Sequence, residues 1–285
     1  MRIFGNKIIL IIILAILLFF FIFNNIKPHI SKNFEISKFI EKIFNEKTNK
    51  RYSLIAHAGG GIDNYTYTNS EEALNNSIKK GFSLIELDMI ETSDNQLVAA
   101  HDWKLFRKIS SCCKDEIPDL NEFNSSVILN KYTPLDTNKI NEIFEKNKKL
   151  ILVIDKTNNF DLINSSFTFD QSRIIVEIFG RDNYLRAIRK GIKNPLYSAS
   201  IEHRDDEKNF INKYDIKMIA ISSSDFIKNK KYFENLKNKK GTIIFLYTTN
   251  DHNFVDSSRD IIDAFYTDFI DINTMKCTSK VCKTY

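Results

Sequence analysis

The sequence predicts a TIM-type (β/α)8 barrel preceded by an N-terminal membrane-anchor helix. From residue 52 onward, short apolar segments typical of strands alternate with segments typical of helices, and eight strand candidates occur in this part of the 285-residue chain. These candidates are apolar at consecutive positions, as expected of parallel strands that are buried on both sides. A run of sixteen apolar residues without interruption, at 8–23, precedes the alternation.

The apolar run is long enough to enter a bilayer. With the three residues that follow, it approaches the roughly 20 residues that a membrane helix needs. Arg2 and Lys7 precede it, and because positive charges tend to remain in the cytoplasm, the rest of the chain is expected on the periplasmic or cell-surface side. A cleaved signal peptide is the alternative, but no cleavage motif of small residues occurs before Ser31. We therefore expect residues 1–30 to hold an uncleaved anchor, which spans the bilayer at about 7–26.

The remaining elements follow in order. Residues 31–51 connect the anchor to the barrel, and the apolar stripe within 31–47 predicts an amphipathic helix that packs beneath the domain at 52–285. The apolar runs predict strands at 52–58, 83–90, 150–155, 173–179, 195–201, 216–222, 242–248 and 266–270, with a further extended segment at 96–102. Helical segments between them are expected at 71–81, 138–147, 182–191, 207–215, 232–240 and 258–265.

The number of strands favours a closed barrel. An open doubly wound sheet is the alternative, but no glycine-rich nucleotide-binding motif follows any of the strand candidates. Eight strands with connecting helices in one domain of this length is what a closed barrel requires.

The charge of the chain argues against nucleic-acid binding. The formal net charge is +5, but residues 1–30 hold three basic residues and no acidic one, which leaves 38 basic against 36 acidic residues in the rest. A nearly neutral domain has no electrostatic field with which to hold a phosphate backbone. No obligate protein partner is evident from the sequence.

Cys112, Cys113, Cys277 and Cys282 are the four cysteines of the chain. Outside the cytoplasm they could form up to two disulfides, in any of three pairings. A zinc site is not expected, because adjacent cysteines cannot easily present both sulfurs to one tetrahedral ion.

Polar residues follow the predicted strands where a barrel places its chemistry, at the C-terminal ends. His57 ends the first strand and is followed by three glycines, which leave the backbone free to approach a ligand. Glu86 and Asp88 point the same way from the second strand. His101 ends the extended segment, and Asp155 ends the third strand, directly before Lys156. Buried carboxylates in such a group require a positive partner, and a hard divalent cation is the usual one.

Each residue also has an ordinary structural explanation. A single histidine at a strand end is commonly a hydrogen-bonded structural group, and Asp155 and Lys156 could simply form an ion pair. The combination at the ends of neighbouring strands is what indicates a site. Glu177, Glu202 and His203 lie at or near later strand ends, where a pocket, core or rim position is equally open, whereas His29 and His252 are expected at the surface.

The segments LIAHAGG, IELDMIETSDNQLVAAHD and YTDF, with thinner matches at LVIDKT, VEIF and LYTTND, resemble the glycerophosphodiester phosphodiesterase family. The barrel-type phosphoinositide-specific phospholipases are its relatives. The resemblance covers most of residues 52–271 and implies a phosphoric diester hydrolase that requires a divalent cation, Ca²⁺ or Mg²⁺. Its substrate would be a small phosphodiester or a lipid-derived head group.

The resemblance also implies roles for individual residues. His57 and His101 match the two catalytic histidines of the family, and Lys156 lies near its phosphate-contacting lysine. The other matched residues divide into metal ligands, which are Glu86, Asp88 and Asp155, and residues near the substrate phosphate, which are Asn69, Gly59 and Gly60.

The chain departs from the family pattern and is a divergent H-A-G-G member. Ala58 stands where the family usually has arginine, and Thr68 stands where it has glutamate before the asparagine. Asp155 is one methylene shorter than the usual ligand, and Lys156 follows it by one position instead of two. Loss of an arginine that can hold phosphate with two hydrogen bonds leaves the substrate open.

Two other functions remain as alternatives. The barrel could have lost turnover and bind a phospholipid head group or surface glycan, or the chain could be a structural protein tethered to the membrane. Both histidines and three carboxylates are present, which favours the enzyme. Its substrate could be a glycerophosphodiester, a lysolipid or a phosphodiester linkage in a surface polymer.

Overall fold

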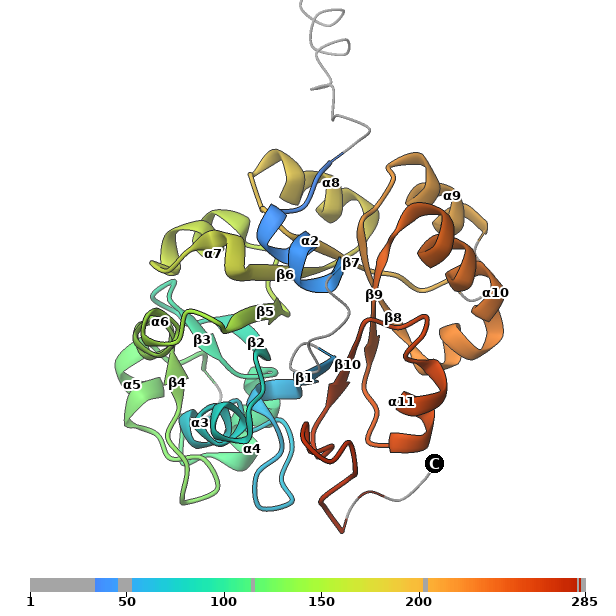
Figure 1. The fold of residues 1–285 in the computed structure, drawn as a ribbon. Helices are drawn as coiled ribbons and strands as arrows, with labels where there is room; N and C mark the ends of the chain where they lie inside the picture. The colour runs from blue at the N-terminus through green and yellow to red at the C-terminus, as the bar shows by residue number, and fades with distance from the viewer. Residues whose placement is uncertain (1–33, 46–52, 114–115, 202–204, 281, 283–285) are drawn as a thin grey trace, which may run out of the picture. The chain divides into compact units, whose positions relative to one another are not determined.

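A computed structural model describes residues 34–45, 53–113, 116–201, 205–280 and 282. Eight parallel strands close into a ring in the order β1, β2, β5, β6, β7, β8, β9 and β10, with β10 pairing again with β1. This ring, shown in Figure 1 with helices around it, confirms the predicted (β/α)8 barrel. Its strands are Leu54–Ala56, Leu84–Glu91, Ile151–Asp155, Ile174–Phe179, Pro195–Ser198, Met218–Ser222, Ile243–Tyr247 and Ala264–Thr267.

The chain leaves the ring once, after β2. Strand β3 (Leu97–Ala99) runs antiparallel to the far end of β2, and β4 (Leu135–Asp136) continues this extension. The predicted extended segment at 96–102 is therefore outside the ring. Beneath it, Val98, Phe106, Phe123 and Tyr132 form a separate small core.

Most of the predicted helices are present, with shifted limits. The helices are α2 (Lys38–Asn45), α3 (Glu71–Lys80), α4 (Trp103–Ile109), α5 (Leu120–Ser125), α6 (Thr137–Lys146), α7 (Phe160–Ser166), α8 (Arg181–Arg189), α9 (Asp205–Lys213), α10 (Ser223–Lys240) and α11 (His252–Ser258), with short 3-10 turns η2 (His57–Gly59) and η3 (Gln171–Arg173). Local signals explain α3, which begins at the capping side chain of Ser70 and ends at Gly81 in the left-handed conformation.

One predicted helix is wrong. Residues 258–265 do not form a helix, because α11 ends at Ser258 and strand β10 already begins at Ala264. The apolar residues of this segment, among them Ile262 and Phe265, join the core between strands and helices. The helical spacing of these residues therefore arises from a turn followed by a strand.

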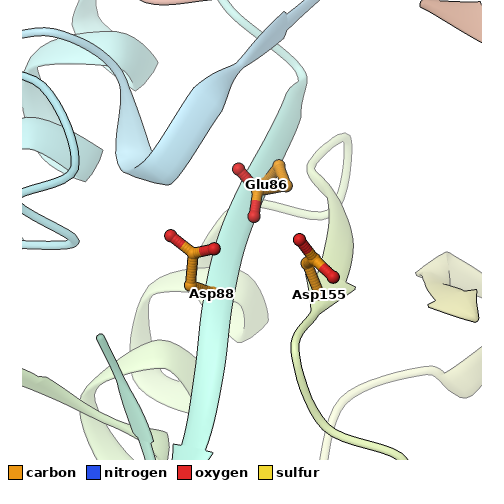
Figure 2. A group of neighbouring side chains, drawn as sticks. All are labelled: Glu86, Asp88 and Asp155. Atoms are coloured by element: carbon orange, nitrogen blue, oxygen red, sulfur yellow. The ribbon is translucent and has the colours of Figure 1, made fainter. Parts of the chain in front are cut away.

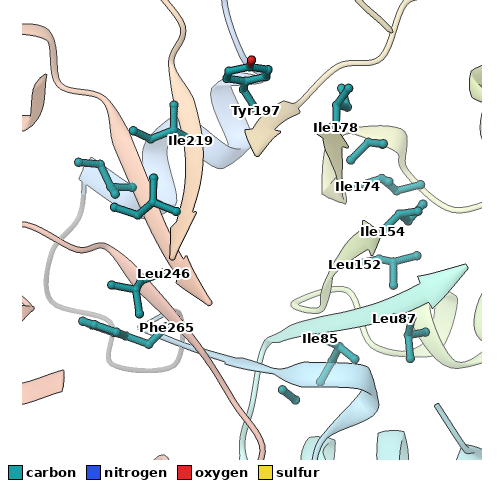
Figure 3. Packing of buried hydrophobic residues seen from close by; sticks show 14 of the residues in the cluster. Ile85, Leu87, Leu152, Ile154, Ile174, Ile178, Tyr197, Ile219, Leu246 and Phe265 are labelled. Carbon is teal, nitrogen blue, oxygen red and sulfur yellow. The ribbon is translucent and has the colours of Figure 1, made fainter. Parts of the chain in front are cut away.

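Alternate residues of the ring strands serve two different cores. Outward-facing residues pack with residues of the helices. Figure 3 shows ten labelled side chains of this core, including Ile85, Leu152 and Ile219. Inward-facing residues such as Leu84, Val153 and Phe245 fill the barrel interior together with Ile40 and Phe44 of α2.

Helix α2 closes the N-terminal end of the barrel. The backbone N–H of Ser37 donates to Oδ1 of Asn194 over 2.9 Å, beside the start of β7, and the Ser37 hydroxyl donates to the carbonyl of Ser172. The prediction that this amphipathic segment packs beneath the domain is confirmed.

The predicted anchor at 7–26 lies outside the described residues. Within the part of the chain that the structure describes, no helix combines the length and apolarity that crossing a bilayer demands. The cysteines are paired Cys112 with Cys113 and Cys277 with Cys282.

Candidate active site

Three carboxylates converge where the pairing of β2 with β5 ends. Asp88 and Asp155 are register partners in the parallel pairing of these strands, and Glu86 lies two residues before Asp88 on the same face. One carboxylate oxygen from each of the three lies within 4.8 Å of the others. Figure 2 shows the three side chains gathered at this point.

Burial makes this cluster costly without a cation. Glu86 and Asp88 are each 1% exposed. Burial, together with the charges of Asp88 and Asp155, raises the pKa of Glu86 well above its ordinary value. Oε2 of Glu86 accepts a 2.7 Å hydrogen bond from the backbone N–H of Ala58, but Oε1 is buried and has no partner among the described residues. An oxygen-rich site with an unpartnered buried carboxylate oxygen fits a hard divalent cation.

Lys156 partly neutralises the cluster. Its Nζ lies 3.1 Å from Oδ2 of Asp155 and 3.7 Å from Oδ1 of Asp88. Burial opposes the charge on Lys156, but the attraction of Asp155 and Asp88 outweighs burial and holds the pKa of Lys156 above its ordinary value. One ammonium group facing three carboxylates leaves room for a further positive charge.

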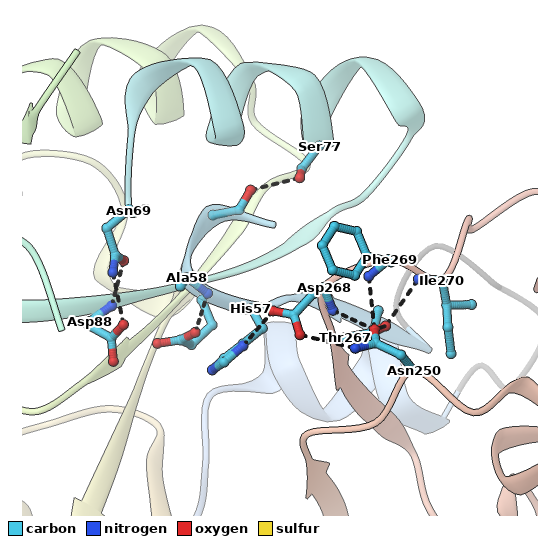
Figure 4. A network of polar contacts seen from close by, with 12 residues as sticks. His57, Ala58, Asn69, Ser77, Asp88, Asn250, Thr267, Asp268, Phe269 and Ile270 are labelled. Carbon is cyan, nitrogen blue, oxygen red and sulfur yellow. Dashed lines mark hydrogen bonds and ion pairs between the residues drawn. The ribbon is translucent and has the colours of Figure 1, made fainter. Parts of the chain in front are cut away.

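His57 follows β1 and is held by the last strand of the ring. Its Nδ1 lies 2.9 Å from Oδ1 of Asp268, directly after β10. Asn250 fixes that carboxylate: its Nδ2 donates to Oδ2 of Asp268, and its Oδ1 accepts from the backbone N–H groups of Asp268 and Phe269 (Figure 4). With Nδ1 engaged, Nε2 is the ring nitrogen of His57 that has no hydrogen-bond partner among the described residues.

His101 is oriented in the same manner. Its Nδ1 lies 2.6 Å from Oδ2 of Asp102, and Oδ1 of Asp102 accepts from the backbone N–H of Leu105 at the start of α4. The carboxylate of Asp102 is therefore fixed by a helix terminus while it holds the imidazole. Each of the two histidines is therefore held at Nδ1 by one carboxylate, an arrangement that is common in general acid–base catalysis.

Asn69, Gly59 and Gly60 lie behind the carboxylate cluster. Nδ2 of Asn69 donates to Oδ2 of Asp88 over 2.9 Å, and Oδ1 of Asn69 accepts from the backbone N–H of Asp88. A Cβ atom at Gly60 would collide with Oγ of Ser77 on α3. Gly60 therefore allows close packing of the protein itself, whereas Gly59 has a φ of 81°, which L side chains rarely adopt. Neither glycine is among the residues that line the cavity.

A cavity of about 190 Å³ opens beside these groups. Its lining combines the two histidines, two of the three clustered carboxylates and several aromatic residues: His57, Tyr67, Glu86, His101, Asp155, Lys156, Glu177, Phe179, Tyr247, Thr248 and Tyr266. The lining side chains come from strands β2, β5, β6, β9 and β10, from the turn η2 and from loops.

Glu177 lines this cavity from β6. Its Oε2 accepts a 2.7 Å hydrogen bond from the hydroxyl of Tyr266. Burial, with the charge of Asp155, raises the pKa of Glu177 to about 7. Glu202 and His203 lie outside the described residues.

Sequence reasoning assigned no role to Asp268, Asn250 or Tyr67. The first two lie within the segments YTDF and LYTTND, which carry the family resemblance, so a signal for them was present. Tyr67 follows no apolar strand, and no pattern in the sequence indicates its position.

The sequence and fold are similar to those of known proteins. Residues 57–272 match the glycerophosphoryl diester phosphodiesterase family. No curated protein sequence matches the chain.

Solved structures share the fold. A phosphodiesterase from Oleispira antarctica, in complex with the product sn-glycerol-3-phosphate, superposes with a TM-score of 0.63 at 15% identity, over 78% of this chain and 96% of that one. A glycerophosphodiester phosphodiesterase from Thermotoga maritima gives 0.58 at 21% identity, over 78% and 95%. One from Parabacteroides distasonis gives 0.62 at 16%, over 85% and 92%.

Proposed function

The chain belongs to the glycerophosphoryl diester phosphodiesterase family and is thus a phosphoric diester hydrolase, and from that premise we propose how it works. We propose that it cleaves a glycerophosphodiester-like substrate to an alcohol and a phosphomonoester, with His57 and His101 as acid and base. A divalent cation, Ca²⁺ or Mg²⁺, assists this reaction.

The observation that carries the proposal is the buried carboxylate cluster between two carboxylate-supported histidines. Glu86, Asp88 and Asp155 would hold the cation, since Oε1 of Glu86 is buried and has no hydrogen-bond partner in the described part of the chain. When bound, the cation supplies neutralisation of phosphoryl charge and lowers the pKa of a hydroxyl near it.

The protein's own groups account for the proton transfers. One imidazole takes the proton of the attacking hydroxyl, and the other protonates the leaving alcohol. Asp268 and Asp102 keep each ring oriented with Nε2 free for this exchange. Lys156 shares the negative charge of the transition state, because its Nζ already lies among the carboxylates at the cavity.

The attacking hydroxyl belongs to the retained alcohol of the substrate. An intramolecular nucleophile avoids the entropy of capturing a water molecule, an advantage of several kcal/mol. The product is then a cyclic phosphate, which a second step opens with water. The glycerol phosphate named in the Oleispira antarctica complex supports an alcohol of this type.

The test uses the full-length chain in detergent with glycerophosphocholine, its analogue lacking the adjacent hydroxyl, and a lysophospholipid, each with Ca²⁺, Mg²⁺ or EDTA. We expect turnover only with a cation, and a cyclic phosphate detectable by phosphorus NMR. His57→Ala and His101→Ala should each lose about 10² to 10⁴-fold in turnover. His252→Ala at the start of α11 is the control.

Equal rates with and without the adjacent hydroxyl would replace internal attack with direct attack by water. Full activity without either histidine would remove them from the mechanism. A chain that binds these compounds without cleaving them would be the head-group-binding alternative.

We also propose that residues 7–26 anchor the protein in a membrane, with the barrel outside the cytoplasm. The sixteen-residue apolar run supports this location. Membrane fractionation and N-terminal sequencing test it. A soluble mature chain that begins near Ser31 would show a cleaved signal peptide instead.

A further inference from the structure

Tyr67 occupies a constrained position beside the reacting groups. Its backbone has φ = 57°, in the left-handed region that bulky residues rarely adopt. The loop is fixed on its far side by Asn69, whose backbone N–H donates to the carbonyl of Ala58 and whose side chain is bound to Asp88. Backbone strain of this kind persists where the surroundings hold the residue in place.

The ring of Tyr67 contacts both catalytic imidazoles. Its centroid lies 4.7 Å from that of His57 and 5.0 Å from that of His101, with interplanar angles of 79° and 82°. Edge-to-face geometry at these distances is attractive. The two histidines come from separate parts of the fold, and the ring of Tyr67 packs against both of them.

The hydroxyl of Tyr67 is available to a ligand. Tyr67 is half-buried and lines the cavity, and no hydrogen bond of its hydroxyl occurs within the described ranges. Burial, then the charges of Asp268 and Asp88, raise the pKa of Tyr67. The phenol therefore keeps its proton near neutral pH, and its hydroxyl can donate a hydrogen bond to an acceptor on a ligand.

The charge of the cavity creates a need for such a donor. Three carboxylates line it, those of Glu86, Asp155 and Glu177, whereas Lys156 is the one lysine or arginine among the lining residues and already faces Asp155. Ala58 contributes a backbone N–H to Glu86 and no side-chain donor. A phosphodiester anion that enters this cavity is stabilised by a neutral hydrogen-bond donor, because such a donor adds no negative charge to the carboxylates already there.

Resting on the proposed function, we propose that the Tyr67 hydroxyl donates a hydrogen bond to a non-bridging oxygen of the substrate's phosphodiester. Its ring at the same time holds the imidazoles of His57 and His101 in their working orientations. Tyr67 is thus a catalytic residue through its hydroxyl and a positioning residue through its ring.

Two substitutions separate these roles. Tyr67→Phe keeps the ring and removes the hydroxyl, whereas Tyr67→Leu removes both. Tyr65→Phe, two residues earlier in the same loop and 49% exposed, is the matched control. All are made in the full-length chain in detergent, and calorimetry with inorganic phosphate at saturating Ca²⁺ measures binding independently of turnover.

We expect Tyr67→Phe to weaken phosphate binding and lower kcat/KM for glycerophosphocholine about tenfold or more, the usual effect of losing a hydrogen bond to a charged group. Tyr67→Leu should have a kcat at least tenfold below that of Tyr67→Phe, because only the phenylalanine variant keeps the ring. Tyr65→Phe should change neither quantity.

Phosphate affinity and kcat/KM within twofold of the parent in Tyr67→Phe would overturn the hydroxyl's role. Equal kcat in the phenylalanine and leucine variants would overturn the ring's role. If the parent chain cleaves no phosphodiester, the proposed function fails, while phosphate binding by Tyr67→Phe still decides the hydroxyl's contact. The unfolding temperature of each variant identifies any loss that comes from folding.

Discussion

The two ends of the barrel interior are lined by the same strands but differ in polarity: the N-terminal end is apolar, and the C-terminal end is acidic. At the N-terminal end, inward positions carry residues such as Leu84 of β2 and Ile151 of β5, which pack with Phe44 of α2. Two or four residues further along the same face, the strands carry Glu86 and Asp155. Because side chains of a strand alternate with a period of two, β2 and β5 each change from apolar to acidic along one face.

The difference separates stability from chemistry along the barrel axis. Burial of apolar residues stabilises the closed end. At the open end, burial raises the pKa of Glu86 and Glu177, which means that their charged forms are disfavoured by the fold. These buried carboxylates cost folding free energy, and they lie at the end of the barrel where a bound ligand can offset that cost.

The strongest test of this separation is removal of an open-end carboxylate. Asp88→Ala should abolish Ca²⁺ and Mg²⁺ binding and lower activity by about 10³-fold, since a bound cation contributes several kcal/mol to transition-state stabilisation. Stability in EDTA should change little, because relief of repulsion offsets the lost partner of Asn69. Calorimetry and thermal unfolding measure both. Asp161→Ala, at an exposed position of α7, is the control, and unchanged cation affinity in Asp88→Ala would remove Asp88 from the site.

The opposite result is expected at the closed end. Phe44 is 7% exposed and packs against Phe245, with ring centroids 5.3 Å apart. Phe44→Ala should cost about 3 to 5 kcal/mol of unfolding free energy, as for other buried phenylalanines, and leave kcat unchanged. Denaturant unfolding measures the loss, with exposed Glu41→Ala as the control. A large fall in kcat at full folding would show that the two ends are coupled.

The pH dependence of stability sharpens the contrast. The pKa of Glu177 rises from its ordinary 4.5 to about 7 on folding, so between these values the folded state holds a proton that the unfolded state has released. Stability without metal should therefore fall as the pH rises from about 4.5 to 7, by up to about 3 kcal/mol from this group. Urea unfolding at several pH values measures this loss of stability, which Glu177→Gln should not show. An identical pH profile in the parent and variant would contradict it.

A smaller effect is expected from the support of His57. Asp268→Asn keeps the size of the side chain but weakens its hold on Nδ1, and should lower turnover about 10- to 100-fold, or about 1.4 to 2.7 kcal/mol in the barrier. Steady-state kinetics measure the loss, with exposed Asp256→Asn as the control. Wild-type turnover in Asp268→Asn would show that the ring of His57 is oriented without it.

The sequence by itself determined the barrel and the residue types of its open end. Consecutive apolar runs are a local consequence of burial on both faces, and a closed barrel places all strand ends of one direction together. His57, Glu86, Asp88 and Asp155 could therefore be grouped without coordinates. In the structure the first two and Asp155 line one cavity, and Asp88 lies beside Asp155. The local amphipathic pattern of α2 was equally readable.

Only the tertiary structure decided which residues support these groups. Asp268 is 211 positions from His57 in the chain, and they meet because β10 closes the ring against β1. Tyr67 reaches both histidines from a loop whose conformation depends on the surrounding packing. The segment 258–265 has helical spacing but ends in a strand, because pairing with β1 and β9 outweighs local preference there. Contacts made by ring closure and loop packing carry no local pattern, because they join residues whose neighbours in the sequence do not take part in them.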